Sequence, residues 1–271
     1  MYEPTRVAVR GPQRGHRRRT GGLALALLSM TALLAPSTVG ASAVAPVTDT
    51  TRLAPTAASW CSSSVGTPTI GRSGTTIVAD NFESGSLSTK WSKTDEGDAW
   101  AGVTNSWAKT GGCAGRLIVS SSYTSRANIR RGLPSGTDEV WATGYFRINK
   151  QGAWGSNVPT FRLFNGNTRI IDLHRLNGSG KLDLRSRTSS GGWRYVNLGR
   201  YIELGRWYYI ELHVKAAYGS SLVSVWLNGT MLYRSYSYPL VTSRLTTVMI
   251  GAEHVRQVMD LGFDNVVVKA Q

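Results

Sequence analysis

The stretch from Val223 to Arg234 constrains the fold of this chain more than any other. It has the sequence VSVWLNGTMLYR, with two runs of alternating β-favouring residues on either side of Asn228-Gly229. Asn-Gly favours a hairpin with a type I′ turn, because both central residues of that turn need a positive φ. Runs 206–215 and 261–268 are also β-rich. We therefore predict a strand, a hairpin and a closing strand in the C-terminal third.

The same kind of pattern continues upstream as far as Thr76. Asn165-Gly166 and Asn177-Gly178 supply further turn signals, and no helical period of about 11 or more residues interrupts the strands. Residues 83–98 are polar and predict a loop around Trp91. Many short strands separated by turns are typical of an all-β sandwich or jelly roll. The predicted upstream strands are 76–82, 100–107, 115–120, 126–131, 140–149, 160–164, 169–176, 181–187 and 193–198.

The order of these motifs resembles that of a known family. W-x-x-I-E-L-H-V from Trp207, V-x-V-W-L-N-G ending at Gly229, I-G at Gly251 and F-D-N-V-V-V from Phe263 look like the laminin-G-like, or concanavalin A-like, jelly roll of secreted bacterial proteins. The D-N-F-E-S-G run from Asp80 fits the usual first strand. The resemblance implies an antiparallel two-sheet sandwich over residues 76–271. It predicts the fold and not the function, since this fold hosts lectins, glycosidases, lyases and adhesion modules.

The first 43 residues predict a secretory signal. Arginines crowd residues 10–19, an apolar run covers residues 22–34, and Ala41-Ser42-Ala43 fits an A-x-A cleavage site. The alternative is a membrane anchor, but this run is short of the roughly 20 residues that span a bilayer. We expect a secreted protein without a membrane span, exported by the general secretory or the twin-arginine route. Residues 44–75 are predicted to form a flexible leader to one domain, 76–271.

The two cysteines, Cys61 and Cys113, both follow the predicted signal. In an oxidising compartment they predict a disulfide that attaches the leader to the domain. On the chain-entropy model such a bond stabilises the fold by roughly 4 kcal/mol. Two free thiols are the alternative, and their separation fits no zinc spacing.

The charge of the chain indicates an anionic partner. The signal contains six Arg and one Glu, so its removal lowers the formal net charge from +15 to +10. A basic exported protein favours acidic polysaccharides, cell-wall polymers or nucleic acid as partners. Nucleic acid is not expected, because the aromatic and basic residues form no recognisable module. The alternative is an Arg-rich codon preference spread evenly over the surface.

Polar side chains fall on one face of several predicted strands and define a candidate sugar-binding groove. The resemblance implies such a groove, because jelly rolls of this kind often bind sugars on a concave face. Arginines would bind carboxylates or sulfates in bidentate geometry, and aromatic rings would stack on sugars. The alternative is the solvated polar face of an antiparallel sheet. The candidate ligand-binding residues are Tyr145, Arg147, Trp154, Arg162, His174, Arg185, Arg187 and Trp193.

A polysaccharide lyase is the catalytic alternative. Its chemistry needs a group that neutralises a uronate, a base for the C5 proton and an acid for the leaving oxygen. The chain resembles jelly-roll alginate lyases at residues 126–130, RANIR against the family's R-x-E-L-R, and at His174, within the family's Q-I-H. The family's third motif, Y-F-K-x-G-x-Y, is absent. If the protein is a lyase, Arg126, Arg130 and His174 are its predicted catalytic residues. No carboxylate motif E-x-D-x-x-E supports a glycosidase.

A calcium site is a further hypothesis. Asp80 opens the first predicted strand, Asp264 lies in the last, and Glu83 follows close to Asp80. Calcium binds several oxygen ligands, whereas the alternative role of these acids is hydrogen bonding at strand ends. As a whole, the sequence predicts an exported jelly roll that binds an anionic polysaccharide or cell-wall glycan without catalysis. A protein-adhesion module is the third interpretation.

Overall fold

A computed structural model describes residues 60–62, 64–87 and 90–271 of the chain. The predicted signal and residues 44–59 of the predicted leader lie outside the described residues. Within the described ranges the chain forms strands joined by turns and loops, without a helix. This part of the chain therefore holds no helix that could cross a membrane.

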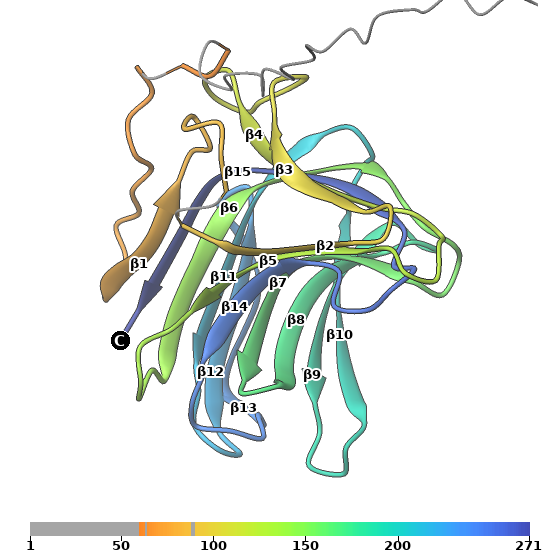
Figure 1. Ribbon diagram of the computed structural model, residues 1–271. Helices are drawn as coiled ribbons and strands as arrows, with labels where there is room; N and C mark the ends of the chain where they lie inside the picture. The colour runs from red at the N-terminus through yellow and green to blue at the C-terminus, as the bar shows by residue number, and fades with distance from the viewer. Residues whose placement is uncertain (1–59, 63, 88–89) are drawn as a thin grey trace, which may run out of the picture. The chain divides into compact units, whose positions relative to one another are not determined.

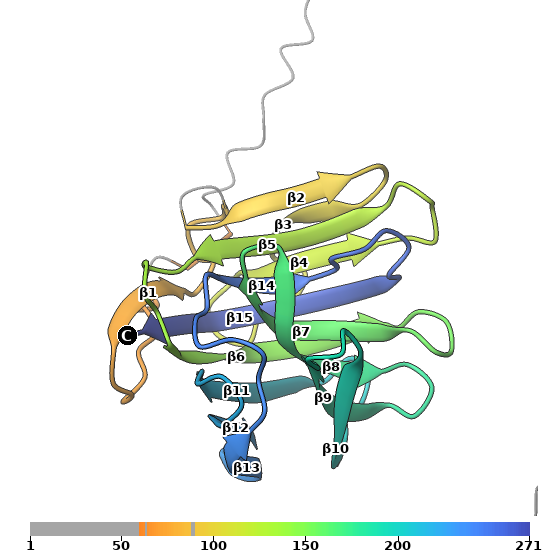
Figure 2. The same ribbon diagram turned by 90° about the horizontal axis from the view of Figure 1, so that it is seen from below.

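The strands form two antiparallel sheets that pack face to face (Figures 1 and 2). The eight-stranded sheet consists of β1 (Thr75–Asp80), β3 (Trp100–Thr104), β4 (Ala114–Val119), β6 (Glu139–Lys150), β11 (Trp207–Lys215), β12 (Ser221–Leu227), β13 (Thr230–Tyr238) and β15 (Met259–Ala270). Its spatial order is β13-β12-β11-β6-β15-β4-β3, and β1 also pairs with β15.

The seven-stranded sheet carries the candidate site. It consists of β2 (Ser92–Glu96), β5 (Arg126–Gly132), β7 (Asn157–Asn165), β8 (Thr168–Leu176), β9 (Lys181–Arg187), β10 (Trp193–Tyr201) and β14 (Thr247–Gly251). Its order is β10-β9-β8-β7-β14-β5-β2. Each sheet thus inserts a late strand between earlier ones, β14 between β7 and β5, and β15 between β6 and β4.

The core lies between the sheets and is built from the inward half of each alternating strand. In β6, Ala142, Phe146 and Ile148 are buried, while Tyr145 and Arg147 between them are partly exposed. This confirms the predicted alternation of β6. Phe146 meets Phe161 of β7 edge to face, with ring centroids 4.8 Å apart, and so joins the two sheets. Alternation leaves each sheet with a polar outer face, and these faces are the surfaces open to a ligand.

The predicted hairpin is present between β12 and β13. Asn228 and Gly229 have φ values of 50° and 80°, the left-handed conformation that a type I′ turn requires. The Asn228 Oδ1 atom accepts a hydrogen bond of 2.8 Å from the Tyr209 N–H, and the Asn228 N–H donates to the Tyr209 carbonyl. The turn residue therefore also fastens the hairpin to β11.

Two strands of the seven-stranded sheet were not predicted from the sequence. β2 lies inside residues 83–98, which were expected to form a loop, and its sequence SKTDE contains no apolar residue. β14 is only five residues long and almost wholly buried, so no alternation marks it. Both strands owe their conformation to pairing with β5 on its two sides.

The segment before β1 is attached to the domain by a disulfide, by an ion pair and by hydrogen bonds such as those from Asn81 Nδ2 to the Val65 and Gly66 carbonyls. Cys61 and Cys113 form the predicted disulfide, with their Cα atoms 5.0 Å apart. Farther along, Arg72 lies against the outer face of the eight-stranded sheet, with its Nη2 atom 2.7 Å from Glu211 Oε1. The described part of the predicted leader thus contacts the sandwich through a covalent bond, an ion pair and hydrogen bonds.

Candidate functional site

A row of side chains crosses the outer face of the seven-stranded sheet. Each member lies opposite the next on the neighbouring strand, and directly opposed side chains project from the same face of a sheet. The adjacent residues Leu163, Leu173 and Leu184 are buried in the core, which places the row on the outside. From β2 to β10 the row consists of Ser92, Arg130, Met249, Arg162, Asp172, Arg185 and Tyr195.

Asp172 is the centre of an ion-pair network in this row. Its Oδ2 atom lies 2.7 Å from Arg185 Nη2, 3.3 Å from Arg169 Nε and 3.5 Å from Arg162 Nε. Its Oδ1 atom lies 3.0 Å from His174 Nδ1. Burial alone would raise the pKa of Asp172, but its hydrogen bonds with His174 and Arg185 and the surrounding positive charge hold that pKa well below its usual range. Asp172 is therefore ionised and holds three guanidinium groups together.

Arg162 is the most deeply buried cation of this network. Its side chain has no exposed area, and burial lowers its pKa to about 10 although Asp172 and Glu253 raise it. Arg162 is thus still protonated at neutral pH. Its Nη1 atom lies 3.6 Å from Glu253 Oε2, and its Nη2 atom donates a 3.4 Å hydrogen bond to Gln257 Oε1. A fixed positive charge therefore lies beneath the middle of the outer face.

Glu253 and His254 reach this network from the loop between β14 and β15. Glu253 Oε2 lies 2.7 Å from Arg169 Nη1 and 3.8 Å from His254 Nε2. Desolvation lowers the pKa of His254, and the positive charges of Arg169 and Arg162 add to it against the opposing charge of Glu253. His254 is therefore mostly neutral at neutral pH, and its side chain is 68% exposed.

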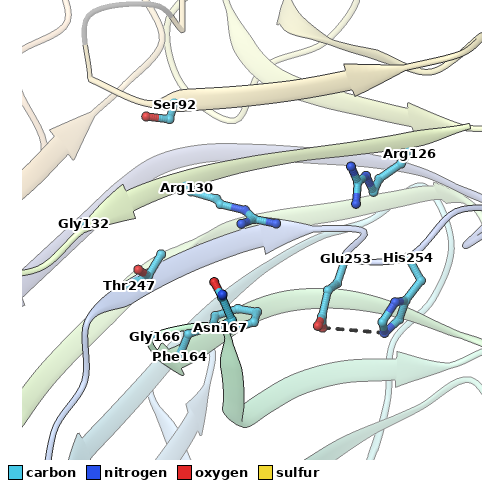
Figure 3. A pocket seen from close by; sticks show the side chains of 10 residues that line it. All are labelled: Ser92, Arg126, Arg130, Gly132, Phe164, Gly166, Asn167, Thr247, Glu253 and His254. Carbon is cyan, nitrogen blue, oxygen red and sulfur yellow. Dashed lines mark ion pairs between the residues drawn. The ribbon is translucent and has the colours of Figure 1, made fainter.

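Three neighbouring hollows lie over the network. The first, of about 510 Å³, lies between Arg126 and Arg130 on one side and Glu253 and His254 on the other (Figure 3). The second, of about 370 Å³, includes Arg187. The third, of about 350 Å³, runs toward the β6–β7 loop. His254 lines all three hollows, so they are neighbours on this face, and we call them together the arginine groove.

Trp193 lies at the β10 end of the arginine groove, surrounded by cations. The guanidinium carbons of Arg169, Arg185 and Arg187 lie 4.4, 4.7 and 5.3 Å from the centroid of its ring. Cations at such distances are attracted to the electron-rich face of an indole. Beside it Tyr195 is 54% exposed, with Arg185 5.9 Å from its ring centroid. This end of the groove therefore combines positive charge with aromatic surface.

The β5 wall of the groove contains the RANIR motif. Arg126, Asn128 and Arg130 alternate along the strand and share one face. Arg126 forms an ion pair with Glu96 of β2. Asn128 is buried, donates to the Ala252 carbonyl at 2.8 Å and accepts from Arg130 Nε at 3.0 Å. Asn128, which stands where the lyase motif has Glu, therefore anchors the β14–β15 loop and orients Arg130.

The structure brings most of the predicted ligand-binding residues together. Arg162, His174, Arg185, Arg187 and Trp193 all belong to the seven-stranded sheet, as do the predicted lyase residues Arg126 and Arg130. His174 is fully buried, with Nδ1 on Asp172 and Nε2 without a hydrogen-bond partner in the described chain.

Tyr145 and Arg147 do not belong to this group. They lie on β6, on the outer face of the other sheet, where Lys109 covers Tyr145 and Arg147 lies over Trp107. The sequence shows that a strand alternates, but it does not show which of two sheets the strand joins. Trp154 is in the β6–β7 loop, 85% exposed, beside the third hollow, which Ser156 also lines.

Three residues of the groove were not predicted from the sequence. Arg169 is three residues from Asp172, so strict alternation would place the two on opposite faces. The register with β7 shifts between Leu163 and Phe164, and such a bulge returns Arg169 to the outer face. Glu253 and His254 lie in a loop, where no periodic pattern marks a residue.

The residues of the calcium hypothesis fit hydrogen-bond anchors and not a cation site. Glu83 Oε1 accepts hydrogen bonds of 3.0 Å from the Gly112 and Cys113 N–H groups. Asp264 Oδ2 accepts from the Lys109 and Thr110 N–H groups. Asp80 accepts from the Phe82 N–H and the Trp91 indole. These donors occupy oxygens that calcium would need. The cluster of Cys61, Glu83 and Cys113 has its sulfurs joined in the disulfide.

Comparison with known proteins identifies the fold of the chain but does not assign the chain to a family. No family of known proteins and no curated protein matches the sequence. Among solved structures, the cellulose induced protein Cip1 matches with a TM-score of 0.55 at 20% identity, over 72% of this chain and 97% of that chain.

Two further matches are similar in extent. The endo-β-1,4-glucuronan lyase of the fungus Trichoderma reesei has a TM-score of 0.54 at 15% identity, over 69% of this chain and 93% of that chain. Domain 4 of AbnA, a GH43 extracellular arabinanase from Geobacillus stearothermophilus, was solved with arabinotriose and also has a TM-score of 0.54 at 15% identity, over 73% and 94%. These likenesses confirm the predicted all-β jelly-roll sandwich.

Proposed function

We propose that the arginine groove binds a chain of an acidic polysaccharide and does not cleave it. The observation that carries the proposal is a row of adjacent hollows with cations on its walls that lack an acidic partner. In the described part of the chain, Arg130 and Arg187 form no ion pair with any carboxylate. A ligand carboxylate or sulfate would satisfy both, because a guanidinium offers two parallel N–H donors to such a group.

Exposed aromatic side chains at the β10 end of the groove and beside the third hollow fit the same class of ligand. Tyr195 is 54% exposed beside Trp193, and Trp154 is 85% exposed near the third hollow. The C–H faces of sugar rings pack against such rings, which remain partly apolar even when they carry a polar group. A ligand chain that crosses the strands would therefore contact aromatic surface at the β10 end and positive charge along the groove.

The fold matches support a glycan ligand. One of the similar structures holds arabinotriose, and another is a lyase that acts on glucuronan. Their low sequence identity leaves open which chemistry this chain performs, so the proposal depends on the groove itself. The net positive charge of the groove favours an acidic glycan over a neutral one as the ligand.

Cleavage by β-elimination is the alternative function, and the groove holds part of what it needs. Arg126 and Arg130 line the first hollow and could neutralise a uronate. A base must also reach the C5 proton of a bound sugar. His174 has no exposed area and its Nδ1 atom is engaged by Asp172, so it cannot touch a ligand in this arrangement. This burial argues against His174 as the base.

The test combines a binding assay with an absorbance assay. We expect the purified protein to bind pectate in a salt-sensitive way, without a rise in the ultraviolet absorbance of unsaturated uronate ends. Arg187→Gln should weaken binding about tenfold, the scale of one lost charge-assisted hydrogen bond. The matched control is Arg234→Gln, an arginine 5.6 Å above Trp226 on the other sheet, which should bind as the wild type does.

Each other outcome identifies a different function. Growing absorbance would establish a lyase and overturn the non-catalytic proposal. Equal losses in the Arg187 and Arg234 variants would show that net charge, and not the groove, attracts the polysaccharide. Failure of the wild type to bind any acidic glycan would favour the third interpretation, a protein partner, or a neutral glycan.

A further inference from the structure

Glu253 occupies a position in the arginine groove where a ligand anion would otherwise bind. Its Oε2 atom lies 2.7 Å from Arg169 Nη1 and 3.6 Å from Arg162 Nη1. Its Oε1 atom has no hydrogen-bond partner among the described residues, and the side chain lines the first two hollows. The carboxylate thus fills a two-arginine cradle with one oxygen and leaves the other for a ligand. Figure 3 shows Glu253 beside His254 at the edge of the first hollow.

The loop that carries Glu253 is held in place on both sides. The Ala252 carbonyl accepts a hydrogen bond of 2.8 Å from Asn128, and the Ala252 N–H donates to the Ala127 carbonyl. Gln257 donates a 2.6 Å hydrogen bond to Asn157 of β7. Because the loop is fastened to β5 and β7, Glu253 is a fixed part of the groove floor and not a mobile surface acid.

The free cations lie on either side of this fixed acid. Arg130 is on β5, and Arg187 is on β9, four strands away in the order β5-β14-β7-β8-β9. Neighbouring strands are about 4.8 Å apart, so the two arginines are separated by roughly 19 Å along the sheet. Glu253 and His254 reach over the strands between them. The side chains along the groove therefore run as arginine, carboxylate and arginine, with Arg162 and Arg169 paired to the carboxylate in the middle.

We propose that Glu253 selects the ligand, by excluding carboxylates from the middle of the groove so that they bind only at Arg130 and Arg187. This inference rests on the proposed function. A ligand carboxylate placed beside Glu253 would meet a like charge, which is costly in an interface. A sugar hydroxyl would instead donate a hydrogen bond to Glu253 Oε1. The ligand class that fits is a polysaccharide whose acidic units are separated by neutral units.

The experiment compares three probes: hyaluronan, in which acidic and neutral sugars alternate, pectate, in which every unit is acidic, and partly methyl-esterified pectin. We expect the wild type to bind hyaluronan and partly esterified pectin more tightly than pectate. Glu253→Gln should raise the affinity for pectate at least about tenfold and so reduce the preference. Glu203→Gln, which removes the same charge from an exposed pair with Arg206 outside the groove, should keep the preference.

The outcomes separate this inference from the function beneath it. Binding of pectate by the wild type as tightly as partly esterified pectin would overturn the selector role, and this comparison needs no variant to fold. An unchanged preference in a folded Glu253→Gln protein would also overturn it, while the proposed function would stand. If the wild type binds none of the three probes, the proposed function itself is rejected.

Discussion

Trp141 on the eight-stranded sheet and Trp193 on the seven-stranded sheet both lie under arginine side chains, but with different results. Arg72 lies 4.5 Å above the Trp141 ring and pairs with Glu211, and His213 stacks on the same ring at 3.6 Å. The chain's own N-terminal segment thus covers that outer face. Over the other sheet the corresponding space is the arginine groove. The proposed binding site therefore lies on the outer face that this segment does not cover.

The two outer faces also treat a buried carboxylate in opposite ways. Asp172 is surrounded by arginines, and its pKa is held below the usual range. Asp264, opposite Tyr145 on the eight-stranded sheet, accepts only peptide N–H groups, and burial raises its pKa to about 6. Positive charge stabilises an ionised acid more than neutral donors do. The arginines of the groove therefore favour the ionised form of Asp172, whereas burial on the covered face favours the protonated form of Asp264.

The largest expected effect comes from removing the central charge of the groove. Asp172→Asn keeps the shape of the side chain but removes the carboxylate 3.5 Å from the buried Arg162, which then keeps only Glu253 at 3.6 Å. Stranding one partner of a buried pair costs about 3 to 5 kcal/mol. The matched variant on the other face, Glu211→Gln, should cost at most about 1 kcal/mol, because Arg72 is 39% exposed. Urea unfolding measures both, and equal losses would contradict the comparison.

The pH dependence of stability should separate the two carboxylates. The pKa of Asp264 is about 6 in the folded protein against a usual 3.8, so the folded state holds that proton more tightly. The free energy of unfolding contributed by Asp264 should then fall as pH rises from about 4 to 6, by roughly 3 kcal/mol at about 1.4 kcal/mol per pKa unit.

Urea midpoints for the wild type and Asp264→Asn, measured between about pH 4 and 7, test this sign. The stability of Asp264→Asn should increase relative to that of the wild type as pH rises, because the variant has no buried carboxylate to ionise. Asp172 should show the reverse slope only below about pH 4, because its lowered pKa makes its contribution disappear as the pH falls below the usual 3.8. If the urea midpoints of the wild type and Asp264→Asn change in parallel with pH, the pKa of Asp264 is not raised in the folded protein.

The smallest effect is expected from uncovering the filled face. Arg72→Ala removes one partly exposed ion pair and two cation–π contacts, with Trp141 and Trp226, together worth about 1 to 2 kcal/mol. It should expose Trp141 and make tryptophan fluorescence more sensitive to acrylamide quenching. Arg206→Ala, which removes an exposed arginine paired with Glu203, should change neither quantity by as much. Unchanged quenching in Arg72→Ala would show that the segment does not cover this face.

The sequence predicted the fold well where strands alternate in long runs. β6, β9 and the β12–β13 hairpin fall within a few residues of their expected positions because period-two burial and Asn-Gly are local signals. β2 and β14 were not predicted because neither alternates. β2 is polar and mostly exposed, and β14 is buried on both faces.

The site was predictable only in part, for a similar reason. Residues such as Arg185 and Arg187 alternate on a strand and could be assigned to a polar face. The assignment of Tyr145 to the same face failed, because the choice between two sheets depends on tertiary pairing. Arg169 depends on a bulge and Glu253 on a loop anchored by Asn128. Long-range contacts of this kind leave no period in the chain.

The insertion of β14 and β15 into the middle of the two sheets has a consequence for how the protein is made. Until residues 247–270 have been synthesised, β5 and β7 lack the strand between them, and so do β4 and β6. Neither layer can close before the last two strands arrive, and closure then depends on contacts far apart in sequence, which form slowly. The nascent chain should remain open until it is nearly complete, the state in which a polypeptide can be threaded through a narrow channel.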